Sequence, residues 1–163
     1  MRYKKRIVWG SIAAVALLVF IAFRFYDAVR ADLRLEKEQA VKTVLQETRI
    51  EQVDAVRPFV GDKPYMVVYG KSDRDEEMIA WVHEDGVDVK LAREGVSSET
   101  IREKMLAKNP EMDIVHINAG KMQDVFVWEV FYKQKEEAGE RYYYDYYRFS
   151  DGSHLDTYRM AAR

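Results

Sequence analysis

Residues 7–23 of the sequence, IVWGSIAAVALLVFIAF, form a run of seventeen residues without a charged side chain. Lys or Arg occupies four of the first six positions, and Arg24 follows the run directly. A bilayer core of roughly 30 Å needs about 17–25 residues of helix, so the run has the length and composition of a short membrane-spanning helix. We therefore predict that residues 1–26 form a basic tip and a transmembrane anchor, and that the rest of the chain is extramembrane.

Two other interpretations of this run fit the sequence less well. A cleaved signal peptide has a shorter apolar core that ends at small residues, whereas Phe23, Arg24 and Phe25 are bulky or charged. A core helix of a globular protein normally has a polar face, which the run lacks. The absence of cysteine excludes a lipid anchor attached at a processed cysteine.

Positive charges on both sides of the run bear on its orientation. Arg24, Arg30, Arg34 and Lys37 lie within about fifteen residues of its second end, the window over which such charges are counted. The density of positive charge directly before the run favours a cytoplasmic N-terminus, and a long domain can be translocated regardless of its charge. We expect a single-pass protein of the cell membrane with an extracytoplasmic C-terminal part.

The charge balance of the remaining residues limits the class of partner. The first 26 residues contain five Lys or Arg and no Asp or Glu, so the rest holds 21 Lys or Arg against 28 Asp or Glu, a formal charge of −7. A nucleic-acid-binding protein needs a basic patch or stripe, so we exclude that class. The absence of cysteine means that no disulfide stabilises the fold.

The sequence predicts a first helix-on-sheet domain over residues 27–94. A helical pattern extends from Asp27 to about Arg49, without Pro or Gly after Phe25, so the helix can continue from the anchor. Strands follow at residues 50–60, 65–70, 78–83 and 87–91, and the pair Arg57-Pro58 places the first of them at a sheet edge. Asp85-Gly86 is a strong hairpin signal between the last two.

The same order of elements recurs over residues 95–163. Ser97 and Ser98 are candidate N-caps of a helix that ends before Asn109-Pro110. Strands are expected at residues 113–118, 125–132, 141–149 and 154–158, with Asp151-Gly152 as a second Asp-Gly turn. The fold class is therefore α+β: a membrane helix, then two tandem domains that each pack a helix on an antiparallel sheet. Each domain is small, so we expect the two to pack together.

The residue types that carry catalysis or bind metals are absent or isolated. The three histidines have no second His or Cys at metal-ligand spacing, and there is no Cys or Gly-x-Ser-x-Gly nucleophile. The glycines form no phosphate-binding loop. We predict no catalytic residue, no metal, no cofactor and no small-molecule substrate, and hence a protein that is not an enzyme.

The anomaly of the sequence is the density of aromatic residues in the last two long strands, VFVWEVFY and RYYYDYYRF. Strand periodicity places apolar or aromatic side chains on both faces of each strand, whereas a helix covers only one face of a sheet. The first domain can cover the second face. Alternatively, that face is a tyrosine-rich contact surface for a protein partner or an extended peptide, because Tyr, Trp and Arg dominate such surfaces.

This arrangement resembles the TseB-like (YpmB-like) membrane proteins of bacilli, which carry tandem cystatin-like or PepSY-type units behind one membrane span. The resemblance covers the full length. It rests on residues 7–23, Glu38-Gln39-Ala40, residues 65–70, Ala80-Trp81-Val82 with Asp85-Gly86, Val127-Trp128-Glu129-Val130, and residues 144–149 with Asp151-Gly152.

The resemblance implies a non-enzymatic, extracytoplasmic regulator of cell-wall elongation that associates with a class B penicillin-binding protein. On that basis we expect four residues of the second sheet to contact the partner: Trp128, Tyr144, Tyr146 and Arg148. Because PepSY-type units also occur in peptidase propeptides, the alternative function is a membrane-tethered peptidase inhibitor. The identity of the partner, the effect of binding on it and the oligomeric state are left open.

Overall fold

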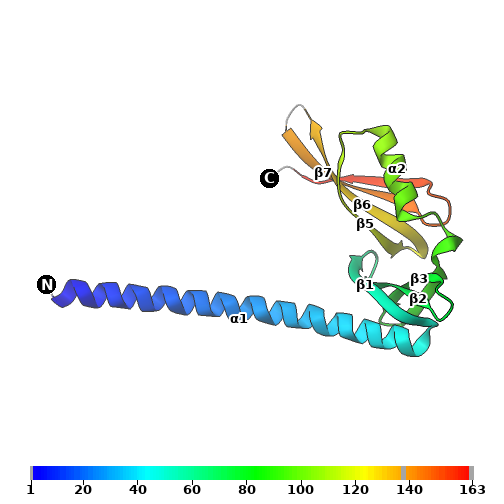
Figure 1. The fold of residues 1–163 in the computed structure, drawn as a ribbon. Helices are drawn as coiled ribbons and strands as arrows, with labels where there is room; N and C mark the ends of the chain where they lie inside the picture. Colours follow the sequence, from blue (N-terminus) through cyan, green and yellow to red (C-terminus); the bar gives the residue numbers. More distant parts are fainter. Residues whose placement is uncertain (1, 137–138, 162–163) are drawn as a thin grey trace. The chain divides into compact units, whose positions relative to one another are not determined.

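The computed structural model describes the backbone of residues 2–136 and 139–161, and the side chains of residues 15–24, 32–136 and 139–161. The chain divides into two compact units, Met1–Glu38 and Gln39–Arg163. Helix α1, Arg2–Glu47, begins in the first unit and ends in the second (Figure 1). It is continuous through residues 25–47, as the absence of Pro and Gly there predicts.

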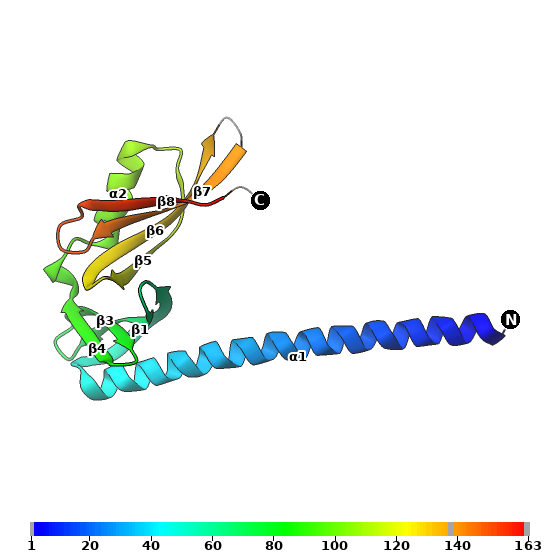
Figure 2. The same ribbon diagram turned by 180° about the vertical axis from the view of Figure 1, so that it is seen from behind.

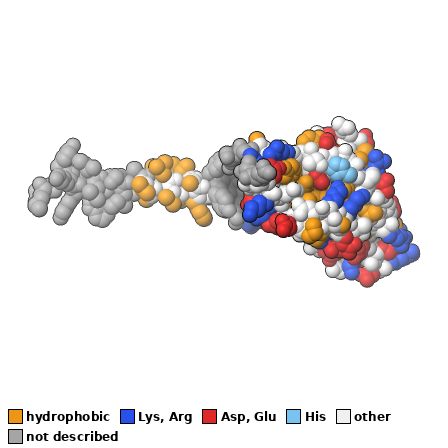
Figure 3. Space-filling view, turned by 90° about the horizontal axis from the view of Figure 1, so that it is seen from above, with side chains coloured by type: hydrophobic (Ala, Val, Ile, Leu, Met, Phe, Trp, Pro, Cys, Tyr) orange, Lys and Arg blue, Asp and Glu red, His pale blue; other side chains and the backbone are white. Residues whose placement is uncertain are grey.

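Only part of the predicted anchor lies among the described side chains. Residues 7–14 of the run fall outside them, whereas residues 15–23 are described. The large apolar side chains of this stretch are 54–67% exposed, and hydrophobic atoms cover most of its surface (Figure 3). Within the described part of the chain, no helix combines the length and the apolar character that crossing a membrane requires.

The first sheet consists of β1 (Ile50–Val60), β2 (Pro64–Ser72), β3 (Glu77–His83) and β4 (Gly86–Leu91). The strands are antiparallel and neighbour one another in chain order, so β1 with Pro58 is an edge strand, as predicted. The end of α1 covers one face of this sheet, where Ala40 and Val44 are buried together with Val68 and Ala80. Two leucines of the same helix, Leu33 and Leu45, are exposed.

A short linker with the 3₁₀ helix η1 (Ala92–Glu94) leads to helix α2 (Ser98–Lys108). The Ser97 hydroxyl accepts a hydrogen bond from the backbone N–H of Thr100, which confirms Ser97 as the N-cap. The helix ends at Lys108, and Asn109 is its C-cap directly before Pro110, as the sequence predicts. Its buried residues are Ile101 and Met105.

The second sheet consists of β5 (Asp113–Met122), β6 (Val125–Glu136), β7 (Gly139–Arg148) and β8 (His154–Arg159), again antiparallel and in chain order. Figure 2 shows α2 lying along one side of this sheet. Gly86 and Gly152 adopt φ of 140° and 67°, which confirms that both Asp-Gly pairs form turns that need glycine. The structure thus has the expected mixed α+β fold with two antiparallel sheets.

The two sheets share one hydrophobic core. Trp81 of the first sheet is fully buried, and its ring centroid lies 4.6 Å from that of Phe126 and 6.0 Å from that of Phe149. Phe59 lies against Gly120, where any side chain would overlap its ring. This core makes Gln39–Arg163 a single compact unit. The predicted division into domains 27–94 and 95–163, and their assignment to a cystatin-like or PepSY-like fold, stay predictions.

Hydrogen bonds and an ion pair add to this contact between the sheets. The Tyr69 hydroxyl donates to Asn118 Oδ1 at 2.7 Å and accepts from the backbone N–H of Ala119 at 2.7 Å. Lys121 Nζ lies 2.9 Å from Asp88 Oδ2. Burial of Tyr69 raises its pKa to about 12. The first sheet is therefore covered by α1 on one face and by the second sheet on the other.

Candidate contact surface

The register between β6 and β7 decides which aromatic side chains share a face of the second sheet. Trp128 is paired with Tyr147, and Phe131 is paired with Tyr144. Directly opposite residues of antiparallel strands point to the same side. Trp128 and Tyr147 therefore lie on one face, whereas Phe131 and Tyr144 lie on the other.

Trp128 lies on the face that α2 covers. It is 4% exposed, and its indole N–H donates to the backbone oxygen of Val96 at 2.9 Å. It also lines a pocket of about 360 Å³ together with Tyr69, Ile79 and Val96. Its burial and its hydrogen bond give Trp128 a packing role between the sheet and the linker before α2. The structure does not bring it together with the other three predicted contact residues.

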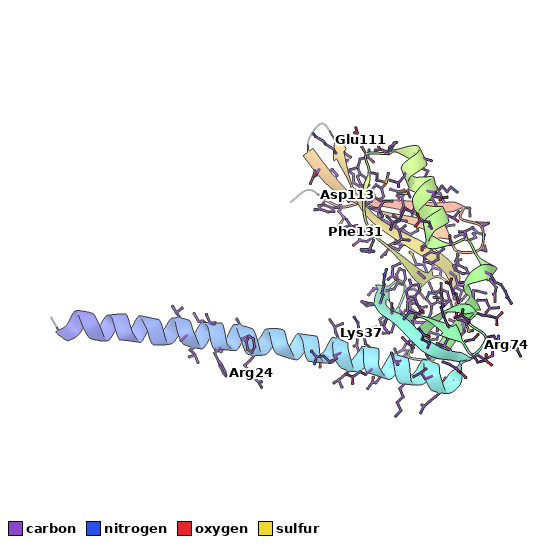
Figure 4. The ribbon with its side chains drawn as sticks, viewed as in Figure 1. Arg24, Lys37, Arg74, Glu111, Asp113 and Phe131 are labelled. Carbon is purple, nitrogen blue, oxygen red and sulfur yellow. The ribbon has the colours of Figure 1, made fainter. Side chains whose placement is uncertain are left out.

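Five aromatic residues lie on the opposite face of the second sheet, and we call this group the aromatic face: Phe131, Tyr142, Tyr144, Tyr146 and Tyr158. Phe131 is at its centre, with ring centroids 4.6 Å from Tyr144 and 5.5 Å from Tyr142 in near-parallel stacks. The rings of Tyr146 and Tyr158 meet edge-on at 5.7 Å. Figure 4 shows Phe131 on the side of the sheet away from α2.

The aromatic face is only partly covered. The first sheet packs against β5, and this contact buries Asn118 and Gly120 on the same side of the sheet. Farther from β5, Tyr142 is 42% exposed and Tyr158 is 52% exposed. From the sequence, either the first domain or a protein partner was expected to cover this face. The first sheet covers the region at β5, whereas the region at β7 and β8 is open.

A half-buried carboxylate lies beneath the aromatic face. The Glu129 side chain is 14% exposed, and its Oε2 accepts a hydrogen bond from the Tyr146 hydroxyl at 2.9 Å. His116 Nε2 lies 3.6 Å from Glu129 Oε1. Burial, and then the negative charge of Glu129, raise the pKa of Tyr146, so its hydroxyl stays protonated and donates.

Arg148 lies at one end of the same face, because it follows Tyr144 and Tyr146 at alternate positions of β7. It is exposed. Three of the four predicted contact residues, Tyr144, Tyr146 and Arg148, thus share a face. The surface also contains four residues that were not predicted to contact a partner: Phe131, Tyr142, Tyr158 and Glu129. Strand periodicity alone indicates that Tyr142 lies on the same face as Tyr144. Placing the other three on this face requires the pairing of β6 and β8 with β7.

The α2 face of the same sheet contains a buried polar network. Asp145 is 4% exposed and accepts hydrogen bonds from the hydroxyls of Tyr132, Tyr147 and Thr157 at 3.2, 3.2 and 2.7 Å. Burial raises the pKa values of Tyr132 and Tyr147, with Asp145 as the second cause. The three hydroxyls that donate to the Asp145 carboxylate satisfy its buried charge. We therefore assign this network a structural role.

The described residues offer no group of three or more His, Cys, Asp or Glu side chains that could hold a metal ion. Each histidine lies near one or two carboxylates: His83 near Asp85 and Asp88, His116 near Glu129, and His154 near Asp145. The aromatic face offers groups of a different kind. Its ring surfaces, its tyrosine hydroxyls and the Glu129 carboxylate are suited to contact with a protein.

Known proteins resemble this chain in both sequence and structure. A family model described as "Cell wall elongation regulator TseB-like domain" matches residues 39–83. "Probable cell wall elongation regulator TseB" of Bacillus subtilis (strain 168) is 29% identical over 148 residues, which cover 86% of this chain and 88% of that protein. The solved structure "YpmB protein from Bacillus subtilis" has a TM-score of 0.63 and 26% identity, and the match covers 76% of this chain and 96% of that one. The chain is therefore similar to TseB and YpmB in both sequence and fold, as its sequence motifs indicate.

Proposed function

We propose that this chain is a non-enzymatic regulator of cell-wall elongation that is held at the cell membrane and binds a class B penicillin-binding protein on the extracytoplasmic side. The observation that carries the proposal is the similarity to the probable cell wall elongation regulator TseB along 86% of the chain. The penicillin-binding protein as partner, and the extracytoplasmic location, come from the family resemblance of the sequence.

The N-terminal stretch supports the membrane attachment. The described residues 15–23 expose apolar side chains such as Leu18 and Phe20. Exposed apolar surface of this extent is a feature of segments that contact lipid or a partner. Lys4, Lys5 and Arg6 before the run support a cytoplasmic N-terminus.

The hydrogen bonds of the polar groups support a role in binding rather than catalysis. Asp145 accepts hydrogen bonds from three hydroxyls. His154 Nε2 lies 2.9 Å from Thr157 Oγ1, but the Thr157 hydroxyl donates to Asp145 and not to the histidine. By contrast, the aromatic face presents partly exposed rings and an exposed Arg148, which are the residue types enriched in binding hot spots.

Chemical crosslinking in membranes of the native host tests this proposal. The full-length chain with an affinity tag is captured after crosslinking, and its partners are identified by mass spectrometry. We expect enrichment of a class B penicillin-binding protein, and loss of that enrichment when a cleavable signal peptide replaces residues 1–26. Protease added to protoplasts should remove Gln39–Arg163 if this unit is extracytoplasmic.

The tethered peptidase inhibitor predicts a different outcome of the same experiment. Recovery of a peptidase in place of the penicillin-binding protein, together with inhibition of that peptidase by the purified full-length chain, would replace the regulator proposal. Turnover of purified wall polymer by the chain would contradict its non-enzymatic part.

A further inference from the structure

The aromatic face has Lys133 and Arg148 at its two ends, but neither side chain lies over one of its rings. Elsewhere, positively charged side chains lie over the rings. Arg57 lies 5.6 Å from the centre of Tyr69, Lys90 lies 4.9 Å from Phe126, and Lys108 lies 5.2 Å from Tyr147. Among the side chains that the structure describes, no Lys or Arg lies over any of the five rings of the aromatic face.

The carboxylate beneath this face has no Lys or Arg partner among the described side chains. Two other partly buried acids have one: Asp88 pairs with Lys121 at 2.9 Å, and Glu76 pairs with Arg93 at 2.8 Å. Within the described residues, Glu129 has only the Tyr146 hydroxyl and His116 within reach, and no Lys or Arg. A carboxylate has about four acceptor positions, so Glu129 retains acceptor capacity.

We propose that the aromatic face binds an arginine side chain presented by a protein partner. The guanidinium packs against the tyrosine rings and donates hydrogen bonds to Glu129. Arginine fits better than lysine because its planar group stacks on an aromatic ring and can donate two parallel hydrogen bonds to a carboxylate. The inference deepens the proposed function, since it rests on a protein being the ligand, and it names the chemistry of the contact.

The charge of the surrounding unit is complementary to such a partner. Residues 39–163 contain 18 Lys or Arg against 24 Asp or Glu, a formal charge of −6. An acidic unit attracts a basic segment and orients it before contact. Arg148 lies at the end of the same face, but it is not within salt-bridge distance of Glu129, so the chain does not itself supply the missing cation there.

Fluorine NMR of the full-length chain in detergent micelles, labelled with 3-fluorotyrosine, tests the inference. The probe is N-acetyl-arginine amide, and the matched control is N-acetyl-citrulline amide, which has the same shape without the charge. We expect the arginine probe to shift the signals of Tyr144, Tyr146 and Tyr158, with a dissociation constant of about 1 mM. The citrulline compound should leave them unchanged.

Two variants locate the binding. Glu129→Gln keeps an acceptor for Tyr146 and should raise the dissociation constant about tenfold, which corresponds to about 1.4 kcal/mol. Glu103→Gln, the same change at an exposed position of α2, should have no effect. If Glu129→Gln does not fold, Tyr158→Leu provides the second test, because it removes an exposed ring and should weaken binding about threefold.

The outcomes separate this inference from the proposed function. Equal shifts with arginine and citrulline, or shifts confined to tyrosines outside the aromatic face, would overturn arginine recognition and leave binding of a penicillin-binding protein intact. Arginine binding that depends on Glu129, combined with no capture of a penicillin-binding protein from membranes, would support the inference and reject that partner.

Discussion

The two sheets of this protein have the same strand order and each carries a helix, but their second faces differ. The first sheet buries Val67, Ile79 and Trp81 on its second face, where it meets the second sheet. The second sheet leaves Tyr142 and Tyr158 about half exposed on its second face. Two sheets of the same architecture thus differ: the first is covered on both faces, and the second has one partly exposed face. We propose that the partner binds at this exposed face.

The largest effect is expected where the two sheets are joined. Trp81→Ala removes the largest fully buried side chain of the shared core and should lower the free energy of unfolding by about 3–5 kcal/mol. Urea unfolding of the full-length chain, followed by circular dichroism, measures this change. A loss below about 1 kcal/mol would show that packing of the second sheet on the first contributes little to stability.

The next effect is expected on the covered face of the second sheet. Asp145→Ala leaves the hydroxyls of Tyr132, Tyr147 and Thr157 without their acceptor and should cost about 2–3 kcal/mol of unfolding free energy. Asp145→Asn retains one acceptor oxygen and should cost less. Asp145 lies on the α2 face of the second sheet and Glu129 on its aromatic face. If Asp145→Ala and Glu129→Gln lower the unfolding free energy equally, the α2 face does not contribute more to stability than the aromatic face.

Tyr69→Phe tests the polar contact between the sheets and should cost about 1–2 kcal/mol near neutral pH, because Asn118 loses a donor and the Ala119 N–H loses its acceptor. The pKa of Tyr69 is about 12 in the folded state, above the ordinary value of 10.0. Its contribution is therefore complete below pH 10 and is lost as the pH rises toward 12.

The raised pKa of Tyr69 predicts how the effect of the Tyr69→Phe substitution changes with pH. The difference in unfolding free energy between the native chain and the variant should shrink between pH 10 and pH 12, measured by urea unfolding at each pH. A difference that grows over this range would mean that ionised Tyr69 is favoured in the folded state, against the burial seen here.

The smallest effect on stability is expected on the aromatic face. Tyr142→Ser removes a half-exposed ring from its stack with Phe131 and should cost about 1 kcal/mol or less. The same variant should weaken capture of the partner from membranes. A large loss of stability with unchanged capture would identify this face as part of the core rather than as a contact surface.

Local sequence signals predicted most elements of the fold. The Asp-Gly pairs at residues 85–86 and 151–152 form turns with positive φ at glycine, Ser97 is the N-cap of α2, and Pro58 lies in an edge strand. Each of these signals depends on a backbone preference that acts within a few residues. For that reason they could be identified from the chain alone.

The composition of the candidate surface could be predicted only in part. Period-two alternation correctly grouped Tyr144 with Tyr146 and Arg148, because that rule acts within one strand. It could not place Trp128, since the pairing of Trp128 with Tyr147 is set by the register between β6 and β7. Nor could it show which face α2 and the first sheet cover, because that choice depends on contacts between residues far apart in the sequence.

The most direct test of the account is site-specific photocrosslinking in cells of the native host. A photoreactive amino acid replaces Tyr142 on the aromatic face or, in a matched protein, exposed Glu103 on α2. We predict a crosslink to a penicillin-binding protein from position 142 and none from position 103. A crosslink to that protein from position 103 alone, or from both positions equally, would contradict the assignment of the aromatic face as the contact surface.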